Sequence, residues 1–183
     1  MTSEPAIKRT VAFFDGQNLF HAAREAFGCK YPDYSPLALA TRICEQRGWS
    51  LHEIRFYTGI PDPKSKPFWH HFWIAKMGAM GHQGIVTFCR RLRYRNQAEY
   101  LPDGTLHTFL VSEEKGIDVR IALDVIRLAR EKALDVALIF SQDQDFSEVA
   151  DEIKSLSSVQ GRWIKIASAF PVSPTARNRD RAA

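Results

Sequence analysis

Two short segments of the chain are apolar at every position, a pattern typical of strands buried on both faces of a parallel sheet. They are residues 11–14 (VAFF) and 136–140 (VALIF), and they predict strands over residues 7–14 and 135–140. Alternating polarity predicts another strand over 51–58, and a last one is expected over 162–167. The segments between them have helical spacing of apolar residues and predict helices over 18–27, 37–47, 68–80, 117–132 and 146–156.

Strands and helices alternate along the chain, which predicts an α/β fold with a mainly parallel central sheet and helices on both faces. A length of 183 residues suits one domain of this three-layer, Rossmann-like kind. Residues 85–95 and 105–111 alternate in polarity on either side of Pro102-Asp103-Gly104, and they predict an inserted β-hairpin. We expect one domain over residues 1–170 and an exposed basic tail over residues 171–183.

Composition excludes several classes of protein. With 45% hydrophobic and 25% charged residues, the chain can bury a core, which argues against disorder. No apolar run approaches the roughly 20 residues that span a bilayer, so we expect no membrane partner. The three cysteines are odd in number and far apart, which indicates a reduced, cytoplasmic protein. The net charge of +4 is only a weak indication of an anionic partner.

Acidic residues follow both of the fully apolar segments. Asp15 follows the first, Asp143 and Asp145 follow the second, and Asp118 opens the helix over 117–132. Because ligands bind at the carboxyl ends of parallel strands, we expect these carboxylates to meet in one crevice. Like charges repel there unless a cation is present, and a divalent ion with oxygen ligands meets that need. Turn or helix-capping chemistry explains each residue singly; their recurrence at three junctions favours a site.

Asp124 falls within the apolar stripe of the same helix, in line with Ile117, Ile121 and Leu128. This spacing predicts a partly buried carboxylate, which needs a partner. Two alternatives stay open: an ion pair with an arginine or lysine, or a metal ligand or a residue that supports one.

Positive charge is concentrated in residues 90–95, which read RRLRYR. In a continuous strand, Arg91, Arg93 and Arg95 would share one face at a spacing of about 7 Å, close to the repeat of phosphates along a single nucleic-acid strand. Such arginines are also explained as protection of an edge hairpin against aggregation. We favour contact with nucleic acid by Arg90, Arg91, Arg93 and Arg95.

Three segments together resemble the motifs of NYN domains (the LabA/DUF88 group). Residues 13–20 (FFDGQNLF) resemble the family's opening hhDGxNL, residues 115–124 (KGIDVRIALD) its KGVDVxLAxD and residues 140–146 (FSQDQDF) its SGDxDF. The segments follow the family's order, and Gln142 stands where the third motif has glycine. The resemblance implies a PIN-like nuclease fold and a ribonuclease that uses Mg²⁺ or Mn²⁺ and leaves 5′-phosphate and 3′-hydroxyl ends.

The resemblance also assigns roles to residues. It implies a metal site and catalytic centre formed by Asp15, Asp118, Asp143 and Asp145, with Asn18 as a further catalytic residue. We expect three residues to support this centre: Asp124, Ser141 and Lys115. Lys115 is also explained as an exposed loop lysine. The expected partner is RNA, and a homodimer is compatible with the family.

Two other functions remain open at this stage. A noncatalytic RNA-binding or regulatory protein would keep the fold and the arginine run. A metal-dependent phosphatase of small substrates would usually carry a DxDxT motif after the first strand, and Gln17 stands against it. We therefore expect an endoribonuclease that acts on single-stranded RNA.

Overall fold

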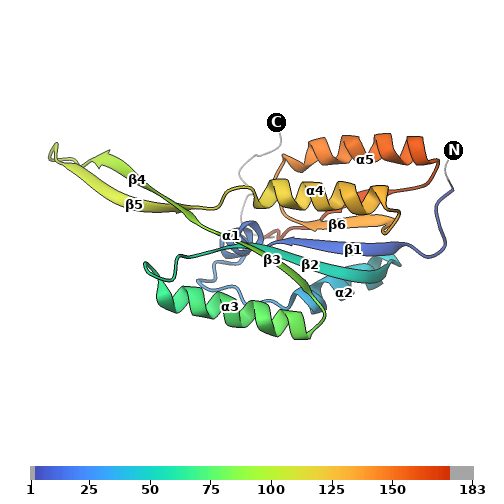
Figure 1. Cartoon of the computed structure of the whole chain (residues 1–183), viewed down its shortest axis with the longest axis horizontal. Helices are drawn as coiled ribbons and strands as arrows, with labels where there is room; N and C mark the ends of the chain where they lie inside the picture. Colours follow the sequence, from blue (N-terminus) through green and yellow to red (C-terminus); the bar gives the residue numbers. More distant parts are fainter. Residues whose placement is uncertain (1–2, 174–183) are drawn as a thin grey trace.

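A computed structural model of the chain describes residues 3–173 and contains a five-stranded sheet with helices on both faces (Figure 1). The strand order is β3-β2-β1-β6-β7, and all neighbours run parallel. These strands are β1 (Arg9–Asp15), β2 (Ser50–Ile60), β3 (Val86–Arg91), β6 (Val136–Phe140) and β7 (Lys165–Ser168). The helices are α1 (Gly16–Phe27), α2 (Pro36–Arg47), α3 (Pro67–His82), α4 (Ile117–Arg130) and α5 (Phe146–Gln160). The predicted α/β class and parallel sheet are confirmed.

Alternate residues of the central strands pack on opposite faces of the sheet, which explains why these strands are apolar throughout. Val11 and Phe13 of β1 belong to the cluster that packs under α4 and α5. Ala12 and Phe14 belong to the cluster on the other face, with α1, α2 and α3. Figure 1 shows the same layers, with α4 and α5 on one side of the sheet and α2 and α3 on the other.

The arginine-rich segment differs from the expectation of one continuous strand over 85–95. β3 ends at Arg91 and pairs with β2 in the main sheet. After a break at Leu92, whose N–H donates to the carbonyl of Ile60, the chain enters a separate antiparallel hairpin. Its strands are β4 (Arg93–Tyr100) and β5 (Leu106–Glu113), and the hairpin projects from the body (Figure 1). The hairpin is therefore confirmed, but Arg91 belongs to a different sheet from Arg93 and Arg95.

The order of the strands places a switch point between β1 and β6. From β1 the chain proceeds outward through β2 and β3, and it returns to the other side of β1 with β6 and β7. Ligand sites of such sheets lie at the carboxyl ends of the two strands that flank this point. Asp15 is the last residue of β1, and the loop that contains Asp143 follows β6.

Two further expectations from the sequence concern the C-terminal tail and membrane-spanning helices. Most of the expected basic tail, residues 174–183, lies outside the described residues. Within residues 3–173, no helix combines the length and the hydrophobicity that crossing a membrane requires.

Candidate active site

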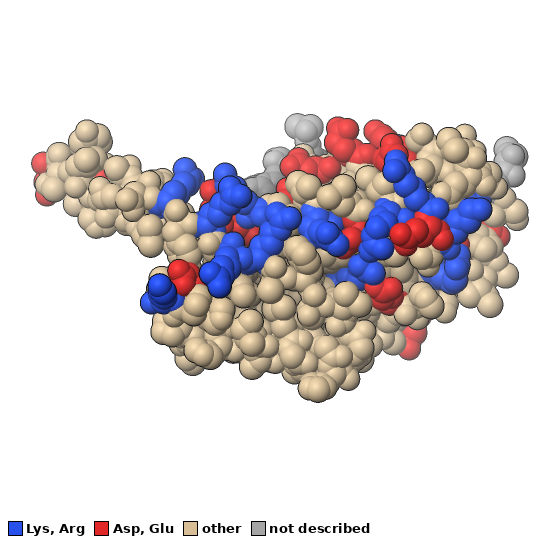
Figure 2. Space-filling view, in the orientation of Figure 1, with Lys and Arg blue, Asp and Glu red and all other residues tan. Residues whose placement is uncertain are grey.

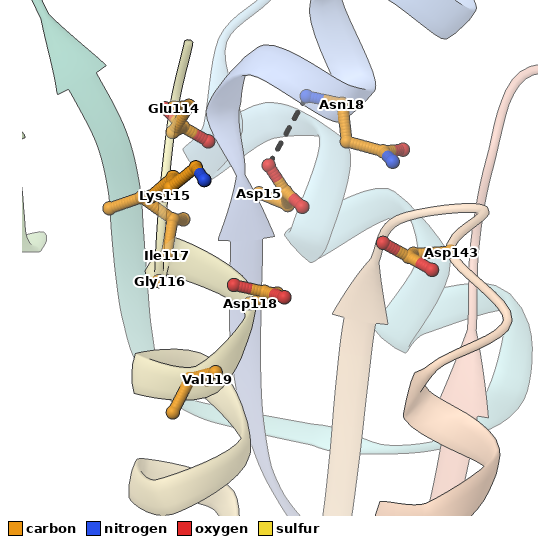
Figure 3. A pocket seen from close by; sticks show the side chains of 9 residues that line it. All are labelled: Asp15, Asn18, Glu114, Lys115, Gly116, Ile117, Asp118, Val119 and Asp143. Carbon is orange, nitrogen blue, oxygen red and sulfur yellow. Dashed lines mark hydrogen bonds between the residues drawn. The ribbon is translucent and has the colours of Figure 1, made fainter. Parts of the chain in front are cut away.

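A pocket of about 480 Å³ opens at the carboxyl edge of the sheet, beside the switch point. It is lined by Asp15, Asn18, Glu114, Lys115, Gly116, Ile117, Asp118, Val119 and Asp143. Figure 3 shows the carboxylates of Asp15, Asp118 and Asp143 directed into the same space from three different elements. The structure thus brings together three of the four aspartates that the sequence predicted as ligands.

Asp15 connects the end of β1 to the start of α1. It is the N-cap of α1, and its Oδ1 accepts a hydrogen bond of 3.2 Å from the backbone N–H of Asn18. The next residue is glycine because the chain passes close to β2 there: a Cβ on Gly16 would lie 2.7 Å from the ring of Phe56. The carboxylate is buried, with 5% of the residue exposed, so the Asp-Gly pair fixes an acid at the base of the pocket.

Asn18 joins two elements of the site through its side chain. Its Oδ1 accepts a hydrogen bond of 3.1 Å from the backbone N–H of Gln142, in the loop after β6. This contact holds the first turn of α1 against the loop that carries Asp143. Gln142 replaces the glycine of the family motif, and its φ is not in the left-handed region that would call for glycine.

Asp118 enters the pocket from the first turn of α4. The preceding cap residue, Gly116, has a φ of +75°, which only glycine adopts without strain. A Cβ at this position would also lie 2.5 Å from Nη1 of Arg90. Glycine here therefore allows the turn that aims Asp118 inward, and it lets an arginine of β3 lie against the pocket wall.

The loop after β6 positions Asp143. The backbone N–H of Asp143 donates to Oγ of the buried Ser141 at 3.1 Å, and its Oδ1 accepts from the backbone N–H of Asp145 at 3.0 Å. A hydrogen bond from the Ser141 side chain also lowers the pKa of Asp15, and the supporting role of Ser141 remains a prediction. Asp145 itself is exposed at the N-terminus of α5 and does not line the pocket. Its role as a ligand remains a prediction.

Glu114 is a fourth acid of the pocket, and the sequence analysis gave it no role. It directly follows the hairpin strand β5, and its carboxylate accepts a hydrogen bond from the backbone N–H of Gly59 in β2. Its place immediately before the Lys115-Gly116 pair was the available signal. The sequence does not show which of the two consecutive glutamates, Glu113 or Glu114, faces the pocket, because adjacent residues of a strand point to opposite faces.

Burial and nearby negative charge make two of the pocket acids, Asp15 and Glu114, hard to ionise. Burial, followed by the charges of Asp143 and Asp118, raises the pKa of Asp15 to about 6, although the Asn18 N–H and the Ser141 hydroxyl oppose the shift. Burial and the charge of Asp15 raise the pKa of Glu114 to about 7. Lys115 is exposed, and its Nζ lies 3.6 Å from Glu113 rather than beside a pocket acid. Among the residues that the structure describes, no lysine or arginine forms an ion pair with these four carboxylates.

The donor set fits a hard divalent cation, since uncompensated carboxylate oxygens face a common space. Their present positions do not enclose an ion: over residues 3–173 no group of three or more His, Cys, Asp or Glu side chains stands ready to hold one. Binding would therefore require the carboxylates to approach one another, which a cation favours by removing their repulsion.

Asp124 lies outside the pocket, within a cluster of arginines. It is buried, and it accepts a hydrogen bond of 2.8 Å from the hydroxyl of Tyr57. Three arginines reach its carboxylate at 3.1–3.5 Å: Arg55, Arg120 and Arg127. These contacts lower the pKa of Asp124 against the opposing effect of burial. Of the two alternatives from the sequence, this arrangement matches the buried ion pair.

Arginines border the acidic pocket on the hairpin side. Figure 2 shows lysines and arginines gathered in a band from the base of the hairpin along α4. The elements beneath this band carry the four arginines predicted to bind nucleic acid, all of them exposed: Arg90, Arg91, Arg93 and Arg95. Arg90 also lies over the ring of Phe88 at 5.7 Å, and Arg95 lies 3.6 Å from Glu113. Contact of these arginines with nucleic acid remains a prediction.

Comparison with known protein families gives one match. A family model described as NYN domain matches residues 9–171, which includes every strand and helix described above. Curated proteins yield no match. Among solved structures, a protein of unknown function from Vibrio parahaemolyticus is 18% identical, with 92% of this chain and 85% of that chain covered and a TM-score of 0.48.

Proposed function

This chain belongs to the NYN domain family, within the PIN-like nuclease superfamily, and from that premise we propose that it is a divalent-metal-dependent ribonuclease. Its reaction would be hydrolysis of phosphodiester bonds within single-stranded RNA. The observation that supports this most is the convergence of Asp15, Asp118 and Asp143 on one pocket, where no lysine or arginine of residues 3–173 pairs with them. A phosphodiester is also anionic, so this pocket would repel its substrate unless a metal ion intervened.

Asp15, Asp118 and Asp143 would hold the ion, and the motif adds Asp145 as a further candidate ligand. A bound Mg²⁺ or Mn²⁺ would supply neutralising charge for the phosphate and a water molecule of lowered pKa. The chain's own contribution is to keep the ligands in place. The Asn18 N–H orients Asp15, the Asn18 side chain holds the loop after β6, and Ser141 contacts both Asp15 and Asp143.

The positive charges outside the pocket would bind the rest of the substrate. Lys115 lines the pocket mouth, and Arg90 lies against Gly116. Phosphates on either side of the cut bond would meet these cations, which position the chain without reading its sequence. The arrangement separates an acidic centre for the chemistry from a basic border for binding.

An Asp143→Asn variant tests the proposal in one preparation. We expect wild-type protein with Mn²⁺ to cut single-stranded RNA, EDTA to abolish cutting, and Asp143→Asn to lose at least a hundredfold in rate, about the loss of 3 kcal/mol of transition-state stabilisation. The matched control is Asp151→Asn, a change of the same residue type on the exposed face of α5. Equal, EDTA-resistant cutting by all three proteins would contradict the proposal.

A second function is favoured by one observation. The exposed Arg90, Arg91, Arg93 and Arg95 beside the pocket would suffice for RNA binding without cutting, which needs no bound ion. The same preparation separates the two functions: a noncatalytic protein would show salt-sensitive RNA binding and no cutting with either Mg²⁺ or Mn²⁺.

A further inference from the structure

Four exposed aromatic side chains form a cluster at the start of α3, and the proposed cleavage chemistry does not use them. Their exposed fractions are 71% for Phe68, 62% for Tyr31, 41% for Phe72 and 39% for Trp69. Trp69 is the centre of the cluster: its ring centroid lies 5.3 Å from that of Phe68, 5.6 Å from Phe72 and 6.3 Å from Tyr31. We call these four residues the aromatic platform.

Packing of the domain does not explain the platform. The inward face of α3 has its own apolar residues, because Trp73 stacks on Phe56 at 6.3 Å and Met80 is buried. Trp73 and Met77 also pack against the core on this side of the sheet. Exposed aromatic surface that the core does not need usually marks a binding site.

Lysines near the platform indicate the charge of what binds there, and one of them, Lys76, also lies 3.6 Å from the exposed Asp33. Nζ of Lys30 lies 5.4 Å from the ring of Tyr31, and Nζ of Lys76 lies 5.8 Å from the ring of Phe72. Lys64 and Lys66 are exposed in the loop that leads into α3. Aromatic rings bordered by cations suit a ligand with flat bases and phosphates. A second copy of the chain would fit less well, because a two-fold contact sets the same lysines against each other.

The platform lies on the pocket side of the molecule. Six residues separate the end of β2 from the start of α3, and that end of β2 belongs to the same sheet edge as Asp15. Tyr34 follows Tyr31 by three residues, a span of at most about 10 Å. Tyr34 packs against the core cluster that contains Phe14, the residue before Asp15, so this loop approaches the acidic pocket.

We propose that the aromatic platform stacks unpaired bases and thereby selects single-stranded nucleic acid for the acidic pocket. The inference rests on the proposed function and adds to it the residues that would select an unpaired strand. In a duplex the bases are stacked on each other and cannot reach the rings, whereas every unpaired base offers a face for stacking.

The test is binding of a uridine oligoribonucleotide and of an abasic ribose-phosphate oligomer of the same length, measured by fluorescence anisotropy in EDTA. We expect Trp69→Ala to weaken binding of the RNA by roughly tenfold or more, as for the loss of a stacked base. It should leave binding of the abasic oligomer unchanged, and Trp69→Phe should retain most of the wild-type affinity for the RNA. Phe27→Ala is the control, because Phe27 is 62% exposed but lies outside the platform.

Other outcomes would overturn the inference. Equal losses on both oligomers, or no loss on either, would show that the platform does not stack bases. A dimer in wild-type protein that Trp69→Ala converts to a monomer, with RNA affinity retained, would assign the platform to self-association. Cutting is measured separately with Mn²⁺. Suppose that wild-type protein does not cut RNA, while Trp69→Ala weakens binding of the RNA but not of the abasic oligomer. That result would contradict the proposed function and still support base stacking by the platform.

Discussion

Asp15 has two roles that oppose each other. As the N-cap of α1 it accepts a backbone hydrogen bond, which favours the charged form. Its burial beside Asp118 and Asp143 disfavours that form, and this effect prevails, since its pKa rises from 3.8 to about 6. Ionisation of Asp15 therefore costs more free energy in the folded protein than in the unfolded chain.

This cost predicts a pH-dependent gain in stability for Asp15→Asn in the absence of metal. The two proteins should be equally stable below about pH 3, where the carboxyl is protonated in both the folded and the unfolded state. As pH rises from about 4 to 6, wild-type protein loses stability and the variant does not, because asparagine is uncharged and still caps a helix. The difference should approach about 3 kcal/mol at most, from a shift of about two units. Urea unfolding in EDTA at several pH values measures it.

Excess Mn²⁺ provides the control for this experiment. An ion that binds the carboxylates stabilises the folded state by mass action, so it should raise the melting temperature of wild-type protein more than that of Asp15→Asn. An Asn variant that is less stable than wild type at pH 8 in EDTA would contradict the assigned charge repulsion.

Asp124 gives a contrasting prediction, because its charge is compensated. Asp124→Asn would remove the buried carboxylate shared by three arginines, and Arg55, whose side chain is only 14% exposed, would keep Glu53 as its partner. Removal of one member of a buried pair is costly, and we expect a loss of about 2–4 kcal/mol in urea unfolding. Cutting by the protein that remains folded should be unchanged, since Asp124 does not line the pocket. A large loss of metal-dependent cutting in folded protein would instead assign Asp124 to the metal site.

At the scale of elements, the segment over residues 85–95 shows where sequence patterns lose information. Polarity alternates regularly over residues 91–95 but not at Phe88-Cys89 or Arg90-Arg91. Such a pattern alone does not reveal that the chain leaves one sheet and enters another. The exchange occurs at Leu92, whose N–H bonds to Ile60, a partner 32 residues away. The central strands, by contrast, were predictable because burial on both faces requires an apolar residue at every position.

The same limit applies to the site. Asp15, Asp118 and Asp143 could be predicted because each lies where a strand ends or a helix begins, and a parallel sheet aligns those points. Glu114 could not, since its contact with Gly59 depends on the path of the hairpin. The exposed position of Asp145 depends on the exact turn after β6, which spacing does not determine.

Gly116 connects the hairpin, β3 and α4, and it gives a prediction at this scale. Gly116→Ala should destabilise the fold by about 1–2 kcal/mol, the cost of a left-handed conformation for a residue with a Cβ. It should also displace Arg90, which the new Cβ would approach at 2.5 Å. Gly78→Ala is the control, since a Cβ in that part of α3 meets nothing within 4 Å, and there alanine should stabilise by about 0.5–1 kcal/mol. Thermal melting of both variants measures the difference in sign.

At the scale of the whole molecule, a net charge of +4 conceals a separation of charge. The pocket gathers Asp15, Glu114, Asp118 and Asp143, while the band along the hairpin base and α4 gathers arginines (Figure 2). Removing these four acids from the 21 leaves 17 against 25 bases, a surplus of eight for the rest of the chain. A polyanion would therefore be attracted to the surround and would need a cation only at the centre.

This separation predicts which arginines govern the dependence of RNA binding on salt. Alanine at Arg90, Arg91 and Arg93 should reduce the slope of log affinity against log salt by about 2, since each phosphate contact on a single strand contributes roughly 0.7. The control removes three exposed arginines from α1 and α2, Arg24, Arg42 and Arg47, and lowers the net charge equally, from +4 to +1. If only net charge mattered, both variants would lose the same slope. A larger change in the first variant would locate the phosphates on the hairpin side, because at physiological salt an exposed charge acts over only about 8 Å.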